Sequence, residues 1–171
     1  MGILSSVDIK KAIKNKEIVI DPMPPQECFG PGSVDVALSE VFYIPKKKLP
    51  KILDASKDSF EQMYEKIKAE EVILKPGDCI LAVTEERLIL APNICGWIQG
   101  RSRFARMGLT AHVASSFIQP GSQNRQVLEI ANLSKVPIKI SKGLRLCQII
   151  FERTDSKPAK PYSKIGKFAK Q

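Results

Sequence analysis

The sequence is poor in residues that bind transition metals. It contains a single histidine, His112, and four cysteines, none of which belongs to a CxxC pair. Protein zinc sites normally bring closely spaced cysteine and histidine ligands together. We therefore predict no zinc site. Three of the four cysteines lie in apolar stretches, so we interpret them as buried thiols. Metal ligands assembled from distant parts of the chain remain the less favoured interpretation.

Long apolar runs are also missing. No stretch approaches the ~20 apolar residues that a membrane-spanning helix needs. No apolar secretory segment follows Met1, and such a segment marks exported proteins. We therefore expect a cytoplasmic protein that has no membrane partner.

Aromatic residues make up only 6% of the chain, although basic residues are abundant. The formal net charge is +9, and such a surplus attracts anionic ligands. The lysines gather in residues 46–51 and in 157–170, but neither cluster alternates with aromatic side chains. Proteins that bind single-stranded nucleic acid usually combine the two. We favour a solvated basic surface over nucleic-acid binding, and we expect no nucleic-acid partner.

The pattern along the chain is mainly β. With 171 residues, the chain is long enough for one domain with a well-formed core. Short apolar runs alternate with turn signals such as Pro76-Gly77 and Pro120-Gly121, which predicts a sandwich or barrel. We expect short helices near 6–13 and over 59–67, the second opened by a capping box of Ser59 and Gln62. Residues 1–153 form the predicted domain, and 154–171 form a mobile tail rich in Lys, Pro and Ser.

Two segments carry candidate chemistry. The first, Gly100–Leu109, places Arg101 and Arg106 around Ser102, and paired guanidinium groups beside a hydroxyl suit a triphosphate. The second is a β-branched stretch with one carboxylate, Glu129. A glutamate on a strand usually points to solvent. Burial beside Val127, on the same face, would instead raise the pKa of Glu129 and suit it to proton transfer.

The order of these motifs resembles the dCTP deaminase branch of the dUTPase-like superfamily. The segments that carry the resemblance are Gly30–Leu38, Leu74–Asp78, Leu81–Glu86, Gly100–Leu109, Val127–Asn132, Pro137–Ile140 and Gln148–Phe151. The resemblance implies a distorted jelly-roll β barrel that assembles as a homotrimer. Its active sites would lie between subunits, and its C-terminal tail would close over the bound nucleotide. It also implies catalysis without zinc, with Mg²⁺ bound to the triphosphate.

The resemblance also implies roles for individual residues. Glu129 would be the general base that activates a water for attack on C4 of cytosine. The positions expected to bind substrate are Arg101, Ser102, Arg106, Ser115, Gln119, Gln148, Tyr162, Lys167 and Gln171. Because the family works without zinc, no metal-binding residue is assigned.

Several positions depart from the family pattern. Related sequences usually carry an aspartate where Gln119 stands, and in dUTPases that carboxylate activates the water that attacks the α-phosphate. An amide cannot act as a base at neutral pH. Arg103 replaces a usual serine, Ser122 a common aromatic residue and Asn124 a common glycine. We expect Asn124 to tolerate the left-handed conformation that such a glycine adopts.

The sequence therefore predicts a dCTP deaminase that makes dUTP and ammonia. One alternative is a dUTP diphosphatase, or a bifunctional enzyme that performs both reactions. A second alternative is a nucleotide sensor without catalytic activity. Glu129 favours an enzyme over a sensor, and Gln119 favours a deaminase over a diphosphatase.

Overall fold

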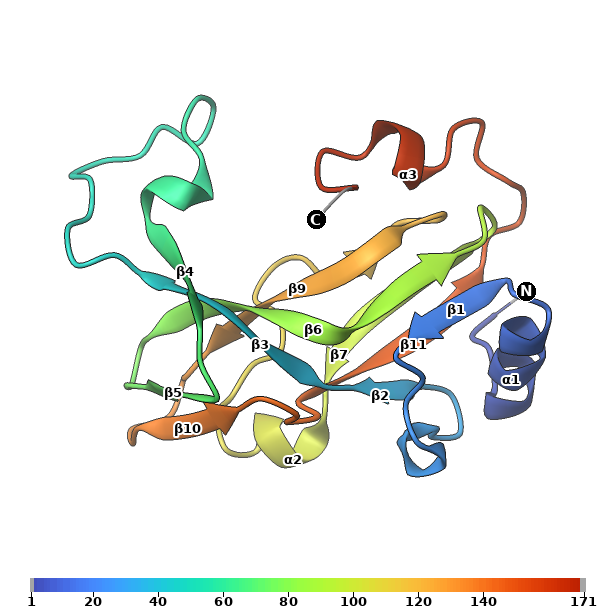
Figure 1. Cartoon of the computed structure of the whole chain (residues 1–171), viewed down its shortest axis with the longest axis horizontal. Helices are drawn as coiled ribbons and strands as arrows, with labels where there is room; N and C mark the ends of the chain where they lie inside the picture. The colour runs from blue at the N-terminus through green and yellow to red at the C-terminus, as the bar shows by residue number, and fades with distance from the viewer. Residues whose placement is uncertain (1, 170–171) are drawn as a thin grey trace.

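The computed structural model describes residues 2–169 and is mainly β (Figure 1). The strands are β1 (Ile18–Asp21), β2 (Val34–Val36), β3 (Leu38–Pro45), β4 (Tyr64–Lys68), β5 (Glu71–Leu74), β6 (Cys79–Leu90), β7 (Ile94–Gly100), β8 (Phe117–Ile118), β9 (Gln123–Ala131), β10 (Ile138–Ser141) and β11 (Cys147–Arg153). The helical elements are α1 (Ser6–Lys14), η1 (Gln26–Cys28), η2 (Phe60–Gln62), α2 (Ser102–Ala105) and α3 (Tyr162–Ile165).

Two larger sheets curl around one hydrophobic core. The first has the order β1-β6-β3-β4, with β9 also paired to β6, and the second has the order β2-β11-β7-β8. Strand β6 alternates between buried and more exposed side chains along most of its length, so one face is turned inward. Phe42 and Leu128 of the first sheet and Phe151 of the second are fully buried in a shared cluster. The predicted fold, a distorted β barrel with a few short helices, is confirmed.

The predicted helix over residues 59–67 is wrong. A single 3-10 turn, η2, is followed by β4, which pairs antiparallel with β3. The apolar spacing that suggested a helix fits both elements, because Phe60 packs edge-on against Tyr43 and Ile67 is half-buried on the strand. The backbone of β3 offers hydrogen-bond partners along its whole edge, and this tertiary pairing overrides a weak local preference.

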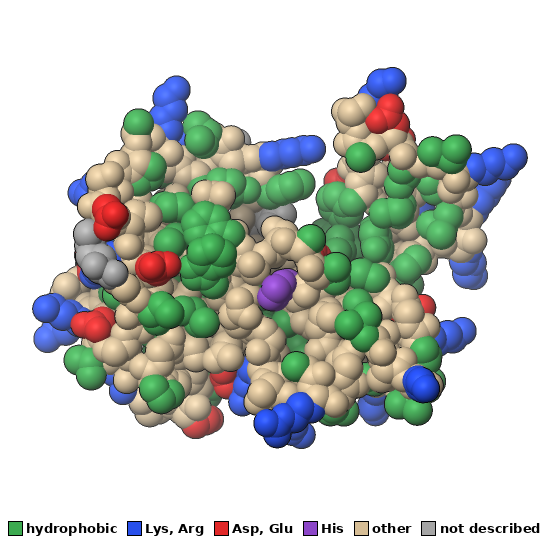
Figure 2. Space-filling model, turned by 180° about the vertical axis from the view of Figure 1, so that it is seen from behind, with side chains coloured by type: hydrophobic (Ala, Val, Ile, Leu, Met, Phe, Trp, Pro, Cys, Tyr) green, Lys and Arg blue, Asp and Glu red, His purple; other side chains and the backbone are tan. Residues whose placement is uncertain are grey.

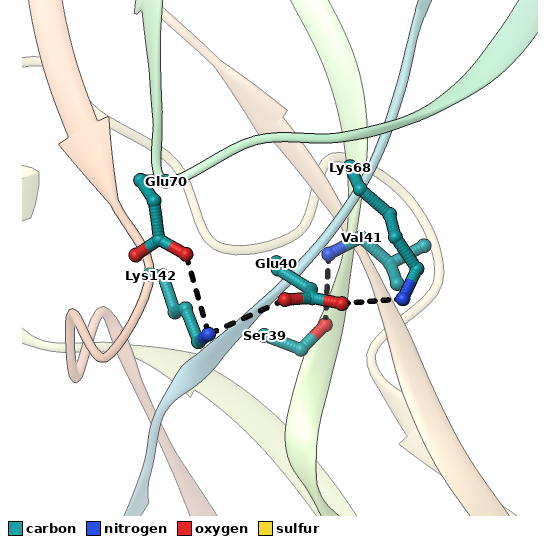
Figure 3. A network of polar contacts seen from close by, with 6 residues as sticks. All are labelled: Ser39, Glu40, Val41, Lys68, Glu70 and Lys142. Atoms are coloured by element: carbon teal, nitrogen blue, oxygen red, sulfur yellow. Dashed lines mark hydrogen bonds and ion pairs between the residues drawn. The ribbon is translucent and has the colours of Figure 1, made fainter.

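A network of charged side chains joins three neighbouring segments (Figure 3). Glu40 of β3 accepts hydrogen bonds from Lys68 of β4 and from Lys142, which follows β10, and Lys142 also pairs with Glu70. These hydrogen bonds lower the pKa of Glu40 and raise that of Lys142. Because the groups are largely exposed, the network adds little to the free energy of unfolding.

The chain beyond β11 folds back onto the turn between β8 and β9. The N–H of Tyr162 donates to the carbonyl of Pro120 at 3.1 Å, and that of Ser163 donates to the carbonyl of Gly121 at 3.3 Å. Farther along, the side-chain amide of Asn124 donates to the carbonyl of Phe168 at 2.9 Å. These contacts place the tail beside the start of β9, at the top of Figure 1.

Asn132, which follows β9, stabilises the barrel through buried hydrogen bonds. Its fully buried amide donates to the carbonyls of Leu74 and Val136 and accepts from the N–H and hydroxyl of Ser134. Asn132→Ala leaves several buried groups without partners, so we expect it to lower the free energy of unfolding by about 2–4 kcal/mol. Denaturant unfolding measures this change. Asn15→Ala, at an exposed position, is the control, and an equal loss for both variants would contradict the expectation.

Candidate active site

Glu129 lies on the outer face of the first sheet, at the floor of a cavity. It pairs across the ladder with Leu81 of β6, and Val127 is its neighbour on the same face. The cavity has a volume of about 680 Å³. Its lining consists of Val41, Tyr43, Phe60, Lys66, Leu81, Val83, Ser115, Arg125, Val127, Glu129 and Phe168. Figure 2 shows a hollow lined by hydrophobic side chains on the face opposite to that of Figure 1. The carboxylate thus meets a largely apolar space.

One oxygen of the Glu129 carboxylate is held by three successive backbone N–H groups. Oε2 accepts from Val113 at 2.8 Å, from Ala114 at 2.6 Å and from Ser115 at 3.2 Å. Among the described residues, no hydrogen bond reaches Oε1. The loop therefore fixes the carboxylate through one oxygen and leaves the other available.

These hydrogen-bond donors lower the pKa of Glu129, whereas we expected burial to raise it. Burial raises the pKa of the carboxyl group, but the hydrogen bonds from Ala114, Val113 and Ser115 and the nearby His112 lower it. The net pKa lies below the ordinary value of 4.5. The expectation of a raised pKa is therefore wrong, because donated hydrogen bonds stabilise the charged form more than burial destabilises it. Glu129 is ionised at neutral pH.

A smaller cavity of about 110 Å³ adjoins the first and shares three of its residues. It contains three predicted substrate-binding residues, Ser115, Gln119 and Tyr162. Gln119 begins a tight turn in which the N–H of Ser122 donates to the carbonyl of Gln119 at 3.2 Å. Gly121 has φ +76, as a type II turn requires after Pro120. The predicted turn is confirmed, and it places Gln119 beside the cavity of Glu129.

Asn124 does not adopt the left-handed conformation that we expected. It is a buried strand residue whose amide oxygen accepts from Gln126 and whose amide nitrogen holds the tail at Phe168. Gly121 supplies the positive φ instead. Asn124 thus anchors the tail and has no part in the geometry of the turn.

The tail brings two predicted residues to this region. Tyr162 contributes to the smaller cavity, and the ammonium of Lys167 lies 5.6 Å from the ring of Phe168, which lines both cavities. Gln171, also predicted to bind substrate, lies outside the described residues. The described tail therefore supplies an aromatic side chain to the cavity of Glu129, and Lys167 lies next to that side chain.

The predicted phosphate-binding residues form a second group around α2. Arg101 precedes this helix, and its guanidinium pairs with Asp35 at 3.0 Å and donates to the carbonyl of Arg145 at 2.9 Å. Ser102 and Arg106 are exposed beside it. Gln148 lies opposite Asp35 in the ladder of β2 and β11, and its side chain accepts from Ser33 at 2.6 Å. Two nitrogens of Arg101 are thus already bonded, whereas Arg106 extends into solvent.

The two groups do not meet within one chain. Arg101, Ser102, Arg106 and Gln148 are absent from the lining of the cavity at Glu129. Figure 1 places α2 and the tail helix α3 on opposite sides of the barrel. Within one copy of the chain, Glu129 and the group around Arg101 therefore lie at two separate places.

Within residues 2–169, no group of three or more His, Cys, Asp or Glu side chains is arranged to hold a metal ion. Cys28, Cys95 and Cys147 are buried, as predicted, and burial raises the pKa of Cys147 to about 12. Among the same residues, no helix is long and apolar enough to cross a membrane.

The sequence did not predict the roles of some residues around Glu129 and Arg101. The N–H groups of Val113 and Ala114 act through the backbone, which no residue type reveals. Asp35, the partner of Arg101, stands in an alternating strand and gave only a weak indication. Phe168 lies in a stretch that composition alone assigns to a tail. In contrast, Glu129 stood out as the single carboxylate of an otherwise apolar strand segment.

The fold matches that of a known deaminase. Over 90% of this chain, the structure superposes with a TM-score of 0.70 on the 2'-deoxycytidine 5'-triphosphate deaminase of Agrobacterium tumefaciens. The two chains are 20% identical, and the matched part spans 48% of that protein. This likeness establishes the shared fold.

Sequence relatives establish the family. A "dCTP deaminase, dUMP-forming" of Methanopyrus kandleri is 35% identical over 98% of this chain and 91% of its own length. A "dCTP deaminase" of Shewanella frigidimarina is 36% identical over 94% of this chain and 88% of its own length. The model of the dCTP deaminase-like family matches residues 3–154. The chain belongs to this family of enzymes.

The three hydrogen bonds to Glu129 predict a pH-dependent contribution to the free energy of unfolding. Because the folded-state pKa is lowered, the charged carboxylate stabilises the fold above its ordinary pKa of 4.5, and this stabilisation is lost as the pH falls through the lower folded value. We expect Glu129→Gln to lower the unfolding temperature at neutral pH and to differ less from the parent as the pH falls below 4.5. Thermal unfolding across this range measures the difference. Glu65→Gln, at an exposed site on β4, is the control. A difference that does not change with pH would refute the lowered pKa.

Proposed function

We propose that this protein deaminates dCTP to dUTP and ammonia without zinc, with Glu129 as the general base. The observation that carries the proposal is the geometry of its carboxylate. Three N–H groups hold Oε2, and the group lies at the floor of a cavity. The carboxylate is ionised at neutral pH and can accept a proton. Its lowered pKa makes it a weaker base than an ordinary carboxylate, so the proposal rests on its position.

The proposed reaction moves both protons of one water. Glu129 first removes one proton as the water oxygen bonds to C4 of the cytosine ring and the C4=N3 double bond opens onto N3. The second water proton then moves from the new hydroxyl to N3. Glu129 passes its proton to the 4-amino group, which leaves as ammonia as the C4–N bond breaks and the C4 carbonyl of dUTP forms. The N–H groups of Val113 and Ala114 keep Oε2 in place, so the proton is carried on Oε1. Holding the base and the ring in this arrangement supplies the gain that proximity gives to catalysis.

The small cavity at the turn is the proposed place for the sugar. Gln119 and Ser115 provide hydrogen-bonding groups there, and Tyr162 closes the cavity from the tail. The tail would cover bound nucleotide with Phe168 and bring Lys167 near the phosphates. This arrangement agrees with the proposal that residues 154–171 act as a closing segment.

The triphosphate would be bound by a second copy of the chain. The Glu129 cavity lacks Arg101, Ser102, Arg106 and Gln148, so one chain presents only part of the proposed site. We propose a homotrimer in which α2 of one subunit faces Glu129 of its neighbour. Exposed Arg106 and Ser102 would then contact phosphate oxygens, while Asp35 holds Arg101 in place.

Magnesium fits this proposal as part of the substrate. The described residues offer no group of three carboxylate, cysteine or histidine ligands. Mg²⁺ typically binds through phosphate oxygens and water with few protein ligands. The ion would neutralise charge on the triphosphate, and the arginines would orient the complex.

A second candidate is formation of dUMP from dCTP, because the relative from Methanopyrus kandleri is named "dUMP-forming". That reaction requires a base for the water that attacks the α-phosphate. Gln119 has an amide, which is not basic at neutral pH. We therefore favour release of dUTP.

Substitution of the proposed base tests the reaction. We expect Glu129→Gln to lower the rate of ammonia release from dCTP by ~10²–10⁴-fold, because general base catalysis is lost. Binding of dCTP should persist within a few-fold. Ammonia and pyrophosphate are measured separately, and the unmodified protein should release ammonia with little pyrophosphate. Abundant pyrophosphate would favour the dUMP-forming alternative, and binding without either product would favour a sensor.

Mixing two inactive variants tests the shared site. Glu129→Gln and Arg106→Ala damage different halves, so each should be inactive alone at low substrate. In trimers mixed at equal amounts, about one quarter of the sites would combine an intact Glu129 with an intact Arg106 from the neighbour. We expect about that share of the parent activity to return after co-expression. Mixed trimers that remain inactive would contradict a site built from two subunits.

A further inference from the structure

The open edge of β9 lies directly beside Glu129. Strand β9 pairs with β6 on one side only. On its other side, the chain after α2 forms a short antiparallel contact, in which Leu109 bridges Asn132 and the N–H of Thr110 donates to the carbonyl of Ala131 at 3.0 Å. The backbone pairing ends there, and the chain leaves the sheet toward the loop that grips the carboxylate.

The side chain of Thr110 continues the contact where the backbone stops. Its hydroxyl accepts from the N–H of Ala131 at 2.8 Å and donates to the carbonyl of Glu129 at 3.1 Å. One hydroxyl thus pairs with two main-chain groups on the edge of β9, and one of them belongs to Glu129 itself. It takes the place of a ladder hydrogen bond and fixes the point at which the loop departs.

Thr110 connects the main chain of Glu129 to the loop that binds its carboxylate. Three residues after Thr110, the loop delivers the N–H groups of Val113, Ala114 and Ser115 to Oε2. The same hydroxyl holds the main chain of Glu129. Thr110 therefore positions both the main chain of Glu129 and the loop whose N–H groups bind its carboxylate. A small displacement of Thr110 changes all three N–H to Oε2 distances.

We propose that Thr110 is a positioning residue for the base, whose hydroxyl sets the register between the 113–115 loop and the strand that carries Glu129. The inference deepens the proposed function and rests on Glu129 as the general base. Thr110 touches neither the water nor the nucleotide in this scheme. It acts through the backbone of Glu129 and through the origin of the loop.

Several other charged or titratable groups surround Glu129 and can influence its titration. They are His112 on the loop, Tyr64 and Lys66 on β4, Cys79 on β6 and Arg125 on β9. None of these is changed by a substitution at Thr110, so any shift in the titration of Glu129 is attributable to its geometry.

The chain offers a matched control in Thr84. Its hydroxyl makes the same kind of double contact, accepting from the N–H of Gln126 at 2.9 Å and donating to the carbonyl of Glu86 at 2.9 Å. It is buried, yet it contacts neither Glu129 nor the 113–115 loop through that hydroxyl. Thr84→Val should therefore cost stability without altering the base.

The experiment compares Thr110→Val, Thr110→Ser and Thr84→Val. We expect Thr110→Val to lower kcat for ammonia release by at least about tenfold with KM within about twofold, because a small misplacement of a catalytic group has large effects on rate. Looser N–H donors raise the pKa of Glu129, so the acid limb of the kcat/KM profile should move to higher pH. Thr110→Ser should restore both properties, and Thr84→Val should leave the acid limb unchanged.

A measurement independent of turnover separates this inference from the proposed function. In Thr110→Val, the stability linked to Glu129, measured as the difference in unfolding temperature from its Glu129→Gln double variant, should be smaller at neutral pH and its loss should be complete at a higher pH than in the parent. If the parent releases no ammonia, the proposed function fails, but this thermal readout still tests the positioning role. An unchanged acid limb and thermal profile in Thr110→Val would overturn the inference. An equal shift in Thr84→Val would also overturn it. If Thr110→Val fails to fold, Thr110→Ala replaces it in the comparison. The inference is overturned if Thr110→Ala also fails to fold and only Thr110→Ser folds.

Discussion

The contact between one carboxylate oxygen of Glu129 and three consecutive backbone N–H groups organises the region around it. It brings residues 113–115 against β9. It holds a charged group in a largely apolar cavity, where burial alone would favour the neutral acid. It also leaves one oxygen without a bond from the described residues, and this asymmetry gives the carboxylate a direction. A rigid, ionised and directed group is what general base catalysis requires.

The second constraint is the Asp35–Arg101 pair on the other side of the barrel. Asp35 is partly buried, and burial raises its pKa while Arg101 and Arg145 lower it, with the net pKa above its ordinary value. The pair uses part of the Arg101 guanidinium to fix the start of α2, so Ser102 and Arg106 are presented from a defined position. Within one chain, Arg101 and Glu129 are therefore held in two separate places.

The sequence predicted the parts of this structure that depend on side-chain type. Alternation along β6 and β9 follows from which residues are apolar, and Glu129 stood out because it interrupts such a pattern. The turn at Pro120-Gly121 was predictable because few residues adopt its dihedral angles. The segment 59–67 was not, since its apolar spacing fits two kinds of element and only the edge of β3 decides between them. The lowered pKa of Glu129 was also beyond prediction, because it depends on where a distant loop points its N–H groups.

The turn at Gln119–Ser122 shows how one short segment can serve several purposes at once. Its conformation needs a glycine at position 121, where φ is +76, and a side chain there would meet Pro161 of the tail at 2.7 Å. The absence of that side chain is what allows the tail to cross the turn and donate to the carbonyls of Pro120 and Gly121. The same turn presents Gln119 to the smaller cavity, which Tyr162 and Phe168 of the tail also line. The same turn therefore forms the hairpin, part of the cavity wall and the docking site of the tail. A substitution that changes its conformation would alter all three.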